Sequence, residues 1–395
     1  MNRNSAENSF TENFGHPCRF LFSAPGRTEL GGNHTDHQHG LVLAAAISLD
    51  TRAAVAENGL SVIRMVSEGY PDFSVDLSDL NVRPEERGTS AALVRGIAAA
   101  FASRGFAPAG FDAAVVSSVT AGGGLSSSAS FEVLIGTILN HLTGAGLSPL
   151  EIARIGQFAE NEYYGKPSGL MDQTACACGG VLFIDFQNTD APAITKLDVD
   201  FRRLGYQLFI IDSGADHSGL TGEYAAVPAE LAKICAFFGK KWLREVPEAD
   251  FYANFRSLEA LAGDRALLRA MHVYEENRRV REELTALQGG NTEAYLKAVK
   301  ASGDSSWKYL QNVIPAGSTF RQELALTLAL TEKILCGNGA CRVHGGGFAG
   351  AIQAFVPLAA AESFTEKLGS IIGKEKIRPL AIRAEGGRKE SFVCL

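Results

Sequence analysis

Hydrophobic and polar positions follow two different periods on either side of one glycine-rich segment. Residues 88–105 are rich in alanine and repeat their apolar side chains at helical spacing, which predicts a helix. Residues 111–119 are apolar and β-branched, which favours a strand. Residues 131–146 return to helical spacing and end near a glycine. The segment between them, 120–130, is therefore predicted to be a loop that leads from a strand into a helix.

The same patterns predict further elements along the chain. Residues 41–58 have the composition of a strand pair with small side chains. Ser148 is a candidate N-cap for a helix that follows it. The other predicted elements are strands at 179–186, 206–214 and 351–356 and helices at 148–164, 267–288 and 318–336.

The order of these elements indicates an α+β protein with two domains. A chain of 395 residues exceeds the roughly 250 to 300 residues at which a single core usually stops growing. A polar segment containing Pro192 separates two predicted strands, and we place the boundary there. Helices and strands do not alternate regularly in either part. The predicted domains are 1–205 and 206–395.

Composition and charge exclude several classes of function. Hydrophobic residues make up 46% of the chain and charged residues 21%, which is ordinary for a globular protein. The net charge of -7, without any basic run, argues against a nucleic-acid partner. No apolar run approaches the roughly 18 to 20 residues of a membrane-spanning helix, and residues 1–17 lack the apolar core of a secretory signal. We therefore expect a cytoplasmic protein without membrane contacts.

The cysteines support the same location. Seven cysteines, an odd number, fit a reducing compartment better than a disulfide framework. Cys176 and Cys178 form a C-x-C pair, but no second pair of Cys or His side chains lies at zinc-site spacing. We predict that these two are buried structural thiols.

The predicted loop at 120–130 has the features of a phosphate site. It contains three consecutive glycines and three consecutive serines, which are Gly122, Gly123, Gly124, Ser126, Ser127 and Ser128. The glycines allow close approach of the backbone, and the serines add hydroxyl donors. Because the loop enters a helix, free backbone N–H groups and the positive end of the helix dipole also favour an anion.

Two other phosphate-binding motifs fail in this chain. Lys166 offers a Walker A candidate, but Glu160 stands where the first glycine belongs and Pro167 follows the lysine. The G-x-G-x-x-G pattern that begins at Gly345 is followed by a predicted strand rather than a helix. Too little chain remains after it for a dinucleotide-binding fold.

Residues 24–40, APGRTELGGNHTDHQHG, combine glycines with ionisable side chains. An ionisable side chain buried without a partner costs roughly several kcal/mol. We therefore expect this segment on a surface loop or in a polar cavity.

Three segments, in this order, resemble the GHMP small-molecule kinases: residues 24–40, GGGLSSSAS at 122–130 and VHGGGFAG at 343–350. Within that group the first segment resembles the galactokinase signature. FGHP at 14–17, GLMDQ at 169–173, DHSGLTGEY at 216–224 and HVYEENRRV at 272–280 resemble galactokinases too. The resemblance spans nearly the whole chain. It implies a domain like domain 2 of ribosomal protein S5 packed on a ferredoxin-like domain, with the active site in the cleft between them.

The resemblance also implies a reaction, the transfer of a phosphoryl group from ATP to the anomeric hydroxyl of galactose. Asp172 matches the aspartate taken to be the general base. Arg27 matches the arginine that stabilises this carboxylate and the transferred phosphoryl group. Ser128 and Glu160 match the Mg²⁺ ligands, and hard oxygen atoms suit this cation.

The remaining matches concern the two substrates. The residues that match or adjoin sugar contacts are Asn33, His34, Asp36, Gly169 and Tyr224. The residues that match the ATP-binding loop are Gly122, Gly123, Gly124, Leu125, Ser126, Ser127, Ser128, Ala129 and Ser130. We expect small molecules as the only partners and a monomer or weak homodimer.

The chain departs from the galactokinase signature at three positions. The signature usually has Glu where Asn33 stands and Tyr where His37 stands, and Glu29 occupies a position where Asn is expected. Because an amide donates as well as accepts hydrogen bonds, these departures are predicted to alter hydroxyl recognition. A kinase for a related sugar, such as an N-acetylated hexosamine or a pentose, remains an alternative, and so does a catalytically silent sugar sensor. The presence of both Arg27 and Asp172 favours an enzyme.

Overall fold

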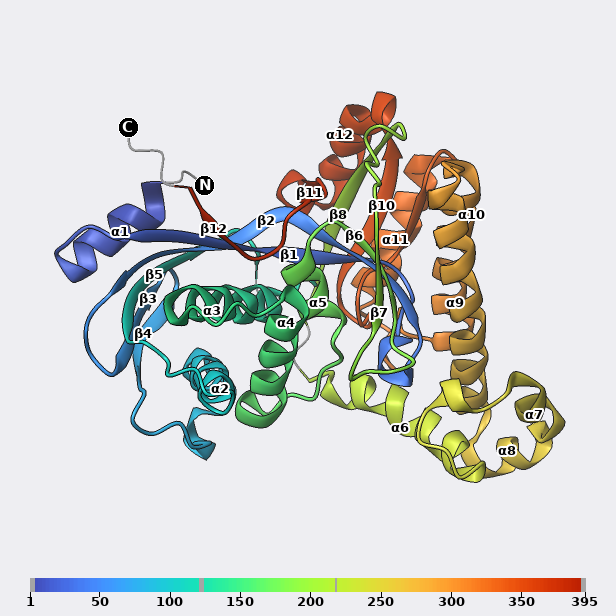
Figure 1. Cartoon of the computed structure of the whole chain (residues 1–395). Helices are drawn as coiled ribbons and strands as arrows, with labels where there is room; N and C mark the ends of the chain where they lie inside the picture. The colour runs from blue at the N-terminus through green and yellow to red at the C-terminus, as the bar shows by residue number, and fades with distance from the viewer. Residues whose placement is uncertain (1–3, 121–123, 217–218, 392–395) are drawn as a thin grey trace.

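The computed structural model describes residues 4–120, 124–216 and 219–391, and two β-sheets organise them (Figure 1). In the first sheet the strand order is β12-β1-β2-β5-β3-β4, and the hairpin of β6 and β7 is joined to β2 through β6. Its strands are β1 (Phe20–Gly31), β2 (Leu41–Glu57), β3 (Val62–Ser67), β4 (Tyr70–Asp76), β5 (Phe111–Ser117), β6 (Val181–Asp185), β7 (Ala193–Leu197) and β12 (Arg388–Glu390).

β2 is one long strand that serves two parts of this sheet. Its second half, 51–57, pairs with β5, whereas its first residues, 41–45, pair with β6. The predicted strand pair at 41–58 is therefore wrong. Ser48 and Asp50 interrupt the apolar pattern without forming a turn, because β2 passes there from one neighbour to the other. The Ser48 N–H donates to the Ala381 carbonyl at this crossing.

Helices cover both faces of the first sheet. The helices are α1 (Asn4–Phe14), α2 (Ser90–Ala102), α3 (Ser127–Thr143), α4 (Pro149–Phe158) and α5 (Met171–Cys178). α2 to α5 share one face, and α1 packs on the other (Figure 1). Along β2, Ala53 and Val55 enter the core under α2 to α5, whereas Ala54 and Ala56 pack with Phe10 of α1. This alternation is the period of two expected of a strand.

Capping explains where two predicted helices begin. The predicted helix at 88–105 is confirmed as α2. Its N-cap is Thr89, whose hydroxyl accepts a hydrogen bond from the N–H of Ala92. Ser148 and Glu151 cap each other's backbone N–H groups in a capping box, which confirms the predicted N-cap of α4. A π-helical turn, Ala159–Tyr164, continues α4.

The predicted loop at 120–130 is wrong at its end, because α3 begins at Ser127. Ser126 is the N-cap, with φ 59° and ψ 57° in the left-handed region. Serine favours both turns and first helical turns, so composition alone could not separate the loop from the helix.

The second sheet is antiparallel, with the strand order β11-β8-β10-β9. Its strands are β8 (Tyr206–Ala215), β9 (Ala340–Val343), β10 (Gly350–Pro357) and β11 (Ile377–Leu380). The helices of this half are α6 (Thr221–Phe237), α7 (Glu248–Ala253), α8 (Phe255–Ala262), α9 (Asp264–Gln288), α10 (Thr292–Ser305), α11 (Glu323–Leu335) and α12 (Ala361–Ile372). α11 and α12 pack on one face, α9 and α10 stand side by side along the other, and α6 to α8 surround the start of α9 (Figure 1).

The remaining predictions of secondary structure are confirmed with small shifts. The helices at 267–288 and 318–336 are α9 and α11, and the strands at 179–186, 206–214 and 351–356 are β6, β8 and β10. The mostly exposed strand β7 was not predicted. Short turns complete the structure at Asp36–Gln38, Pro84–Glu86, Leu243–Glu245, Ser306–Leu310, Leu358–Ala360 and Lys374–Lys376.

The α+β class is confirmed, and β12 returns the end of the chain to the first sheet beside β1. Cys176 is buried as predicted, whereas Cys178 is only partly buried. Across the described residues, no helix combines the length and the apolar character needed to cross a bilayer.

Candidate active site

Residues 24–40 form one wall of a polar cavity. They complete β1 and then turn through Asp36–Gln38. Only 6% of Arg27, 3% of Glu29 and none of Asn33 is exposed. The expectation of a polar cavity is confirmed, and the alternative of a surface loop is wrong.

Many of the predicted site residues meet at this cavity of about 180 Å³. They come from β1 and the turn after it, from the start of α5 and from the π-helical turn. Those that line the cavity are Arg27, Asn33, His34, Asp36, Glu160, Gly169 and Asp172. Tyr224 lies at an adjoining cavity of about 550 Å³ that shares Asp36 and Gly169, and its hydroxyl donates to the Gly347 carbonyl at 2.8 Å.

Arg27 holds Asp172 in a two-point ion pair. The Nε of Arg27 donates to Oδ1 of Asp172 at 2.7 Å, and Nη2 donates to Oδ2 at 3.0 Å. The third nitrogen, Nη1, donates to the Gly124 carbonyl, and the Ser126 hydroxyl donates to Oδ2 of Asp172. Among the described residues, Oδ1 therefore accepts one hydrogen bond and Oδ2 accepts two. A fixed carboxylate with an open lone pair on Oδ1 lies beside the start of α3.

Two carboxyl groups in the cavity have pKa values shifted in opposite directions. Burial acts to raise the pKa of Asp172, but the charge and hydrogen bonds of Arg27 outweigh it and hold this pKa below its usual value. Burial and the nearby charge of Asp172 raise the pKa of Asp36 to about 6. At neutral pH Asp172 is therefore ionised, and Asp36 takes up a proton just below neutrality.

Gly169 leaves room for the Asp36 side chain. A Cβ at this position would lie 2.1 Å from Oδ2 of Asp36. Any other residue would push the Asp36 carboxylate away from the cavity. The glycine of the GLMDQ segment thus sets the position of an acidic side chain from the turn after β1.

His37 and His34 belong to a chain of hydrogen bonds in which each group donates to the next. The Leu243 N–H donates to Oε1 of Gln38 at 3.0 Å, so the amide nitrogen of Gln38 faces Nδ1 of His37 at 3.2 Å and donates to it. Nε2 of His37 then donates to Nδ1 of His34 at 3.1 Å, and Nε2 of His34 donates to the Gly346 carbonyl at 2.9 Å. Burial lowers the pKa of both rings, that of His37 to about 3. Both histidines are neutral, and their ring nitrogens are occupied.

The side-chain amide of Asn33 is also hydrogen-bonded within the protein. Its Nδ2 donates to Oε1 of Glu29 at 3.0 Å and to the Gly345 carbonyl at 2.6 Å. Its Oδ1 accepts from the side chain of Asn312 at 2.9 Å. The amide therefore ties the turn after β1 to the glycine turn at 345–346.

Two residues of α9 hold the backbone of the same turn. Oε1 of Glu276 accepts from the N–H groups of Gly32 and Asn33 at 3.2 and 3.3 Å. Nε2 of His272 donates to the Asn33 carbonyl at 2.9 Å. Burial acts to raise the pKa of Glu276, but the charges around it, Arg279 first, lower it to about 2. The sequence predicted no role for His272 and Glu276, which lie in the family-like segment 272–280. Their spacing of four residues does place them on one face of a helix.

The predicted ATP-binding loop divides between the cavity and the core. Gly122 and Gly123 lie outside the described residues. Gly124 is partly buried, Leu125 and Ala129 are buried, and Ser127 and Ser128 stand in the first turn of α3, where backbone N–H groups are free for an anion. Ser130 is turned inward, because its hydroxyl donates to the Ala24 carbonyl at 2.9 Å.

The two predicted metal ligands lie next to each other. The Ser128 hydroxyl is 3.2 Å from Oε1 of Glu160. Nζ of Lys166 donates to the same Oε1 at 2.9 Å, and Nε2 of Gln173 donates to Oε2 at 2.9 Å. Adjacent hydroxyl and carboxylate oxygens fit a hard cation such as Mg²⁺, which binds few protein ligands when phosphates supply the others. The contribution of Lys166 was not predicted.

A larger cavity of about 660 Å³ adjoins the start of α3. It lies among the β3–β4 hairpin, α2 and β5, and Ser127 and Ser128 form its border toward the predicted phosphate loop. Apolar side chains such as Phe73, Leu93 and Val115 contribute to its lining. No sequence motif marked this cavity, because its lining comes from ordinary core and hairpin residues.

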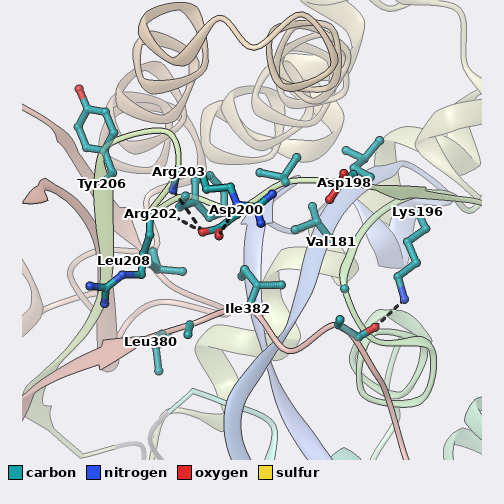
Figure 2. A pocket seen from close by; sticks show the side chains of 16 residues that line it. Val181, Lys196, Asp198, Asp200, Arg202, Arg203, Tyr206, Leu208, Leu380 and Ile382 are labelled. Carbon is teal, nitrogen blue, oxygen red and sulfur yellow. Dashed lines mark hydrogen bonds and ion pairs between the residues drawn. The ribbon is translucent and has the colours of Figure 1, made fainter.

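A separate cavity of about 520 Å³ lies between the two sheets, near β7, β8 and β11 (Figure 2). Several of its charged groups are already paired: Asp200 accepts from the backbone N–H groups of Arg202 and Arg203, and Lys196 donates to the Ala384 carbonyl (Figure 2). No predicted site residue lines it. Many of the predicted site residues lie instead at the cavity beside Asp172.

Known families match the chain at the segments that build this cavity. The galactokinase galactose-binding signature matches residues 8–57, and the N-terminal domain of GHMP kinases matches residues 92–180. The galactokinase of Streptomyces coelicolor is 32% identical over 362 residues, which cover 90% of this chain and 89% of that protein. The galactokinase of Lacticaseibacillus paracasei is 32% identical over 386 residues, covering 95% of each chain.

Solved structures show the same fold. The galactokinase of Lactococcus lactis complexed with galactose superposes with a TM-score of 0.83 at 24% identity, covering 97% of this chain and 98% of that chain. A mevalonate kinase superposes with a TM-score of 0.66 at 18% identity, covering 93% of this chain and 100% of that chain.

Replacement of Asp36 by Asn is expected to raise the thermal unfolding midpoint at pH 7.5. The native pKa of Asp36, about 6, lies above its usual value, so ionisation costs stability as the pH rises through this range. The gain should shrink as the pH falls from about 6 toward 4, where the wild-type carboxyl is protonated. Thermal scans at several pH values measure this, with the exposed Asp198→Asn as a control. A gain that does not change with pH would contradict the assignment.

Proposed function

The chain belongs to the galactokinase family of GHMP kinases, and from this premise we propose that Asp172 and Arg27 carry the transfer of the γ-phosphoryl group of ATP to the anomeric hydroxyl of galactose. The observation that supports this assignment most strongly is the two-point pair of Arg27 and Asp172 at the border of the sugar cavity and the phosphate loop. Family membership supplies the enzyme class, an ATP-dependent sugar 1-kinase. The residue roles below are our assignments.

Asp172 is assigned to the acceptor hydroxyl of the sugar. Its open lone pair on Oδ1 receives the anomeric O–H and aims the oxygen at the phosphorus atom. The lowered pKa keeps the carboxylate ionised at neutral pH, but it also makes Asp172 a weak base. Proton transfer to Asp172 therefore fits a late step, when the forming bond to phosphorus has made the hydroxyl acidic.

Arg27 is assigned two tasks. Its Nε and Nη2 fix the Asp172 carboxylate, and its Nη1 reaches the backbone of the phosphate loop at Gly124. A guanidinium in this position faces the oxygens of the phosphoryl group in flight, where positive charge lowers the barrier. Burial at 6% exposure strengthens this electrostatic effect, because little water screens it.

The nucleotide is assigned to the cavity of about 660 Å³. Its apolar lining suits the adenine ring, and the N–H groups at the start of α3 suit the phosphates. Ser128 and Glu160 are assigned to Mg²⁺, which neutralises the charge of the β and γ phosphates when bound. Lys166, already hydrogen-bonded to Glu160, adds a second positive charge at the border of the two substrates.

Sugar contacts are assigned to Asp36 and Gly169, with Tyr224 at the adjoining cavity. His34 and Asn33 are assigned a supporting role, because their side-chain polar atoms already form hydrogen bonds with other parts of the protein. We propose a cytoplasmic enzyme that works as a monomer or weak homodimer. Two arguments support this location. The cytoplasm supplies ATP, and an odd number of cysteines fits its reducing conditions better than a set of paired disulfides would.

Replacement of Asp172 by Asn is expected to lower kcat by roughly 10² to 10⁴ and to change galactose affinity much less, because the carboxylate acts mainly on the proton in flight. Arg27→Lys keeps the charge and loses the two-point geometry, so it should also slow turnover. The two losses should be non-additive in a double-mutant cycle, since Arg27 positions Asp172. Steady-state kinetics and calorimetry measure both effects. Turnover near that of the wild type in Asp172→Asn would reject the base assignment.

Replacement of Ser128 by Ala or of Glu160 by Gln is expected to raise the Mg²⁺ concentration needed for half-maximal turnover. Galactose binding without nucleotide should persist, because neither side chain is assigned to the sugar. Titration of activity with Mg²⁺ at fixed ATP measures the first effect, and calorimetry with galactose alone measures the second. Variants that keep the wild-type Mg²⁺ dependence would remove both residues from the metal site.

Replacement of Ala91 by Phe is expected to raise KM for ATP roughly tenfold or more, because the added ring occupies the apolar cavity beside Leu93. The KM for galactose should change little. Ala99→Phe, on the same helix but outside the cavity lining, serves as the matched control. Equal effects of the two substitutions on KM for ATP would place the nucleotide elsewhere.

A further inference from the structure

Two of the departures from the galactokinase signature contact each other. Glu29 stands where Asn is expected, and Asn33 stands where Glu is expected. In the structure the Asn33 amide donates to the Glu29 carboxylate at 3.0 Å. Both residues are buried: 3% of Glu29 and 0% of Asn33 is exposed. The two positions therefore carry the same two chemical groups as the signature, with their places exchanged.

Arg342 explains why the carboxylate lies at position 29. This guanidinium is buried, it donates to Oε1 of Glu29, and its Nη1 lies 3.6 Å from Oε1 of Glu276. Glu276 is already paired with Arg279 at 2.7 Å. Without Glu29, Arg342 would depend on Glu276, which already pairs with Arg279, and on Glu283, whose pKa burial raises well above its usual value. An arginine buried with too little countercharge is strongly destabilising.

The surroundings of Asn33 also favour an amide at that position. Its Nδ2 bridges two acceptors, the Glu29 carboxylate and the Gly345 carbonyl. A carboxylate at position 33 would present a negative oxygen to both acceptors with no proton between them. A lone return to the signature glutamate at position 33 would therefore place two buried carboxylates side by side.

We propose that Glu29 and Asn33 are a reciprocally exchanged pair that acts as one positioning unit: Glu29 neutralises Arg342, and Asn33 fastens the turn after β1 to the glycine turn at 345–346. Asn33 supports the sugar cavity without presenting a free N–H group to the substrate. The role in positioning rests on the proposed function, whereas the coupling between the two residues does not.

The test exchanges the two groups back without changing side-chain size. Asn33→Asp and Glu29→Gln are each expected to lower the equilibrium constant for folding by roughly tenfold or more, because the first places a second buried carboxylate beside Glu29 and the second leaves the buried Arg342 without its partner. The double variant moves the negative charge from position 29 to position 33 and restores one hydrogen bond between an amide and a carboxylate. It should recover part of the loss. Equilibrium unfolding without substrate measures all four proteins.

Glu283→Gln provides the matched control. Glu283 is buried in the same region, burial first and then the charge of Glu276 raise its pKa well above the usual value, and its carboxyl oxygens have no hydrogen-bond partner among the described residues. Its substitution keeps the size of the side chain and leaves the hydrogen bond between Asn33 and Glu29 in place, so its effect should add to that of Asn33→Asp. Additive effects of Glu29→Gln and Asn33→Asp would overturn the proposed coupling.

Kinetics test the positioning role. Asn33→Asp should raise KM for galactose roughly tenfold with a smaller change in kcat, because Asp172 and Arg27 are untouched, and the added Glu29→Gln should bring KM back toward the wild-type value. A KM that is unchanged in the folded Asn33→Asp variant would overturn this role. Failure of the wild-type enzyme to phosphorylate galactose would instead reject the proposed function, and the unfolding cycle would still decide whether the pair is coupled.

Discussion

The structure depends on the burial of ionic side chains along a single strand, β1. Arg27 and Glu29 are both nearly inaccessible to water, and each needs an opposite charge supplied by a distant part of the chain. Arg27 finds Asp172 at the start of α5, and Glu29 finds Arg342 in β9. Removal of one partner from a buried pair such as Glu29 and Arg342 typically costs about 3 to 5 kcal/mol. The pair of Arg27 and Asp172 contributes less, because 33% of the Asp172 side chain is exposed. The convergence of β1, α5 and β9 is thus a condition for folding as well as for chemistry.

The same burial separates the roles of the two carboxyl groups at the sugar cavity. Asp172 has an arginine beside it and stays ionised, whereas Asp36 faces the charge of Asp172 and has a pKa of about 6. Two groups of the same chemical kind therefore differ in pKa because their neighbours differ. Low exposure also keeps His34 and His37 neutral, so these rings contribute hydrogen bonds and shape without adding charge.

Sequence reasoning found the parts of the site that short motifs encode. The helix after the glycine and serine segment, although not its first residue, the Ser148 cap and the convergence of Arg27 with Asp172 could be predicted, since each depends on local chemistry or on a recognisable segment. The length of β2 could not be predicted, because its polar interruption at 48–50 is a change of neighbour rather than a turn. The pairing of Glu29 with Arg342, which are 313 positions apart, left no local signal. The large apolar cavity near α3 was missed for the same reason.

In the proposed reaction, the charges around the cavity beside Asp172 would make a cation necessary for the phosphoryl donor. Four carboxyl groups line the cavity, Glu29, Asp36, Glu160 and Asp172, against two cationic side chains, Arg27 and Lys166. Arg342 offsets Glu29 from behind, which leaves an excess of one negative charge when Asp36 is ionised. The γ phosphate of ATP adds further negative charge at the same border. Coulomb repulsion between buried charges is strong, so in the proposed reaction the phosphate would approach Asp172 only with added positive charge. The adjacent oxygens of Ser128 and Glu160 lie where a divalent cation would supply it.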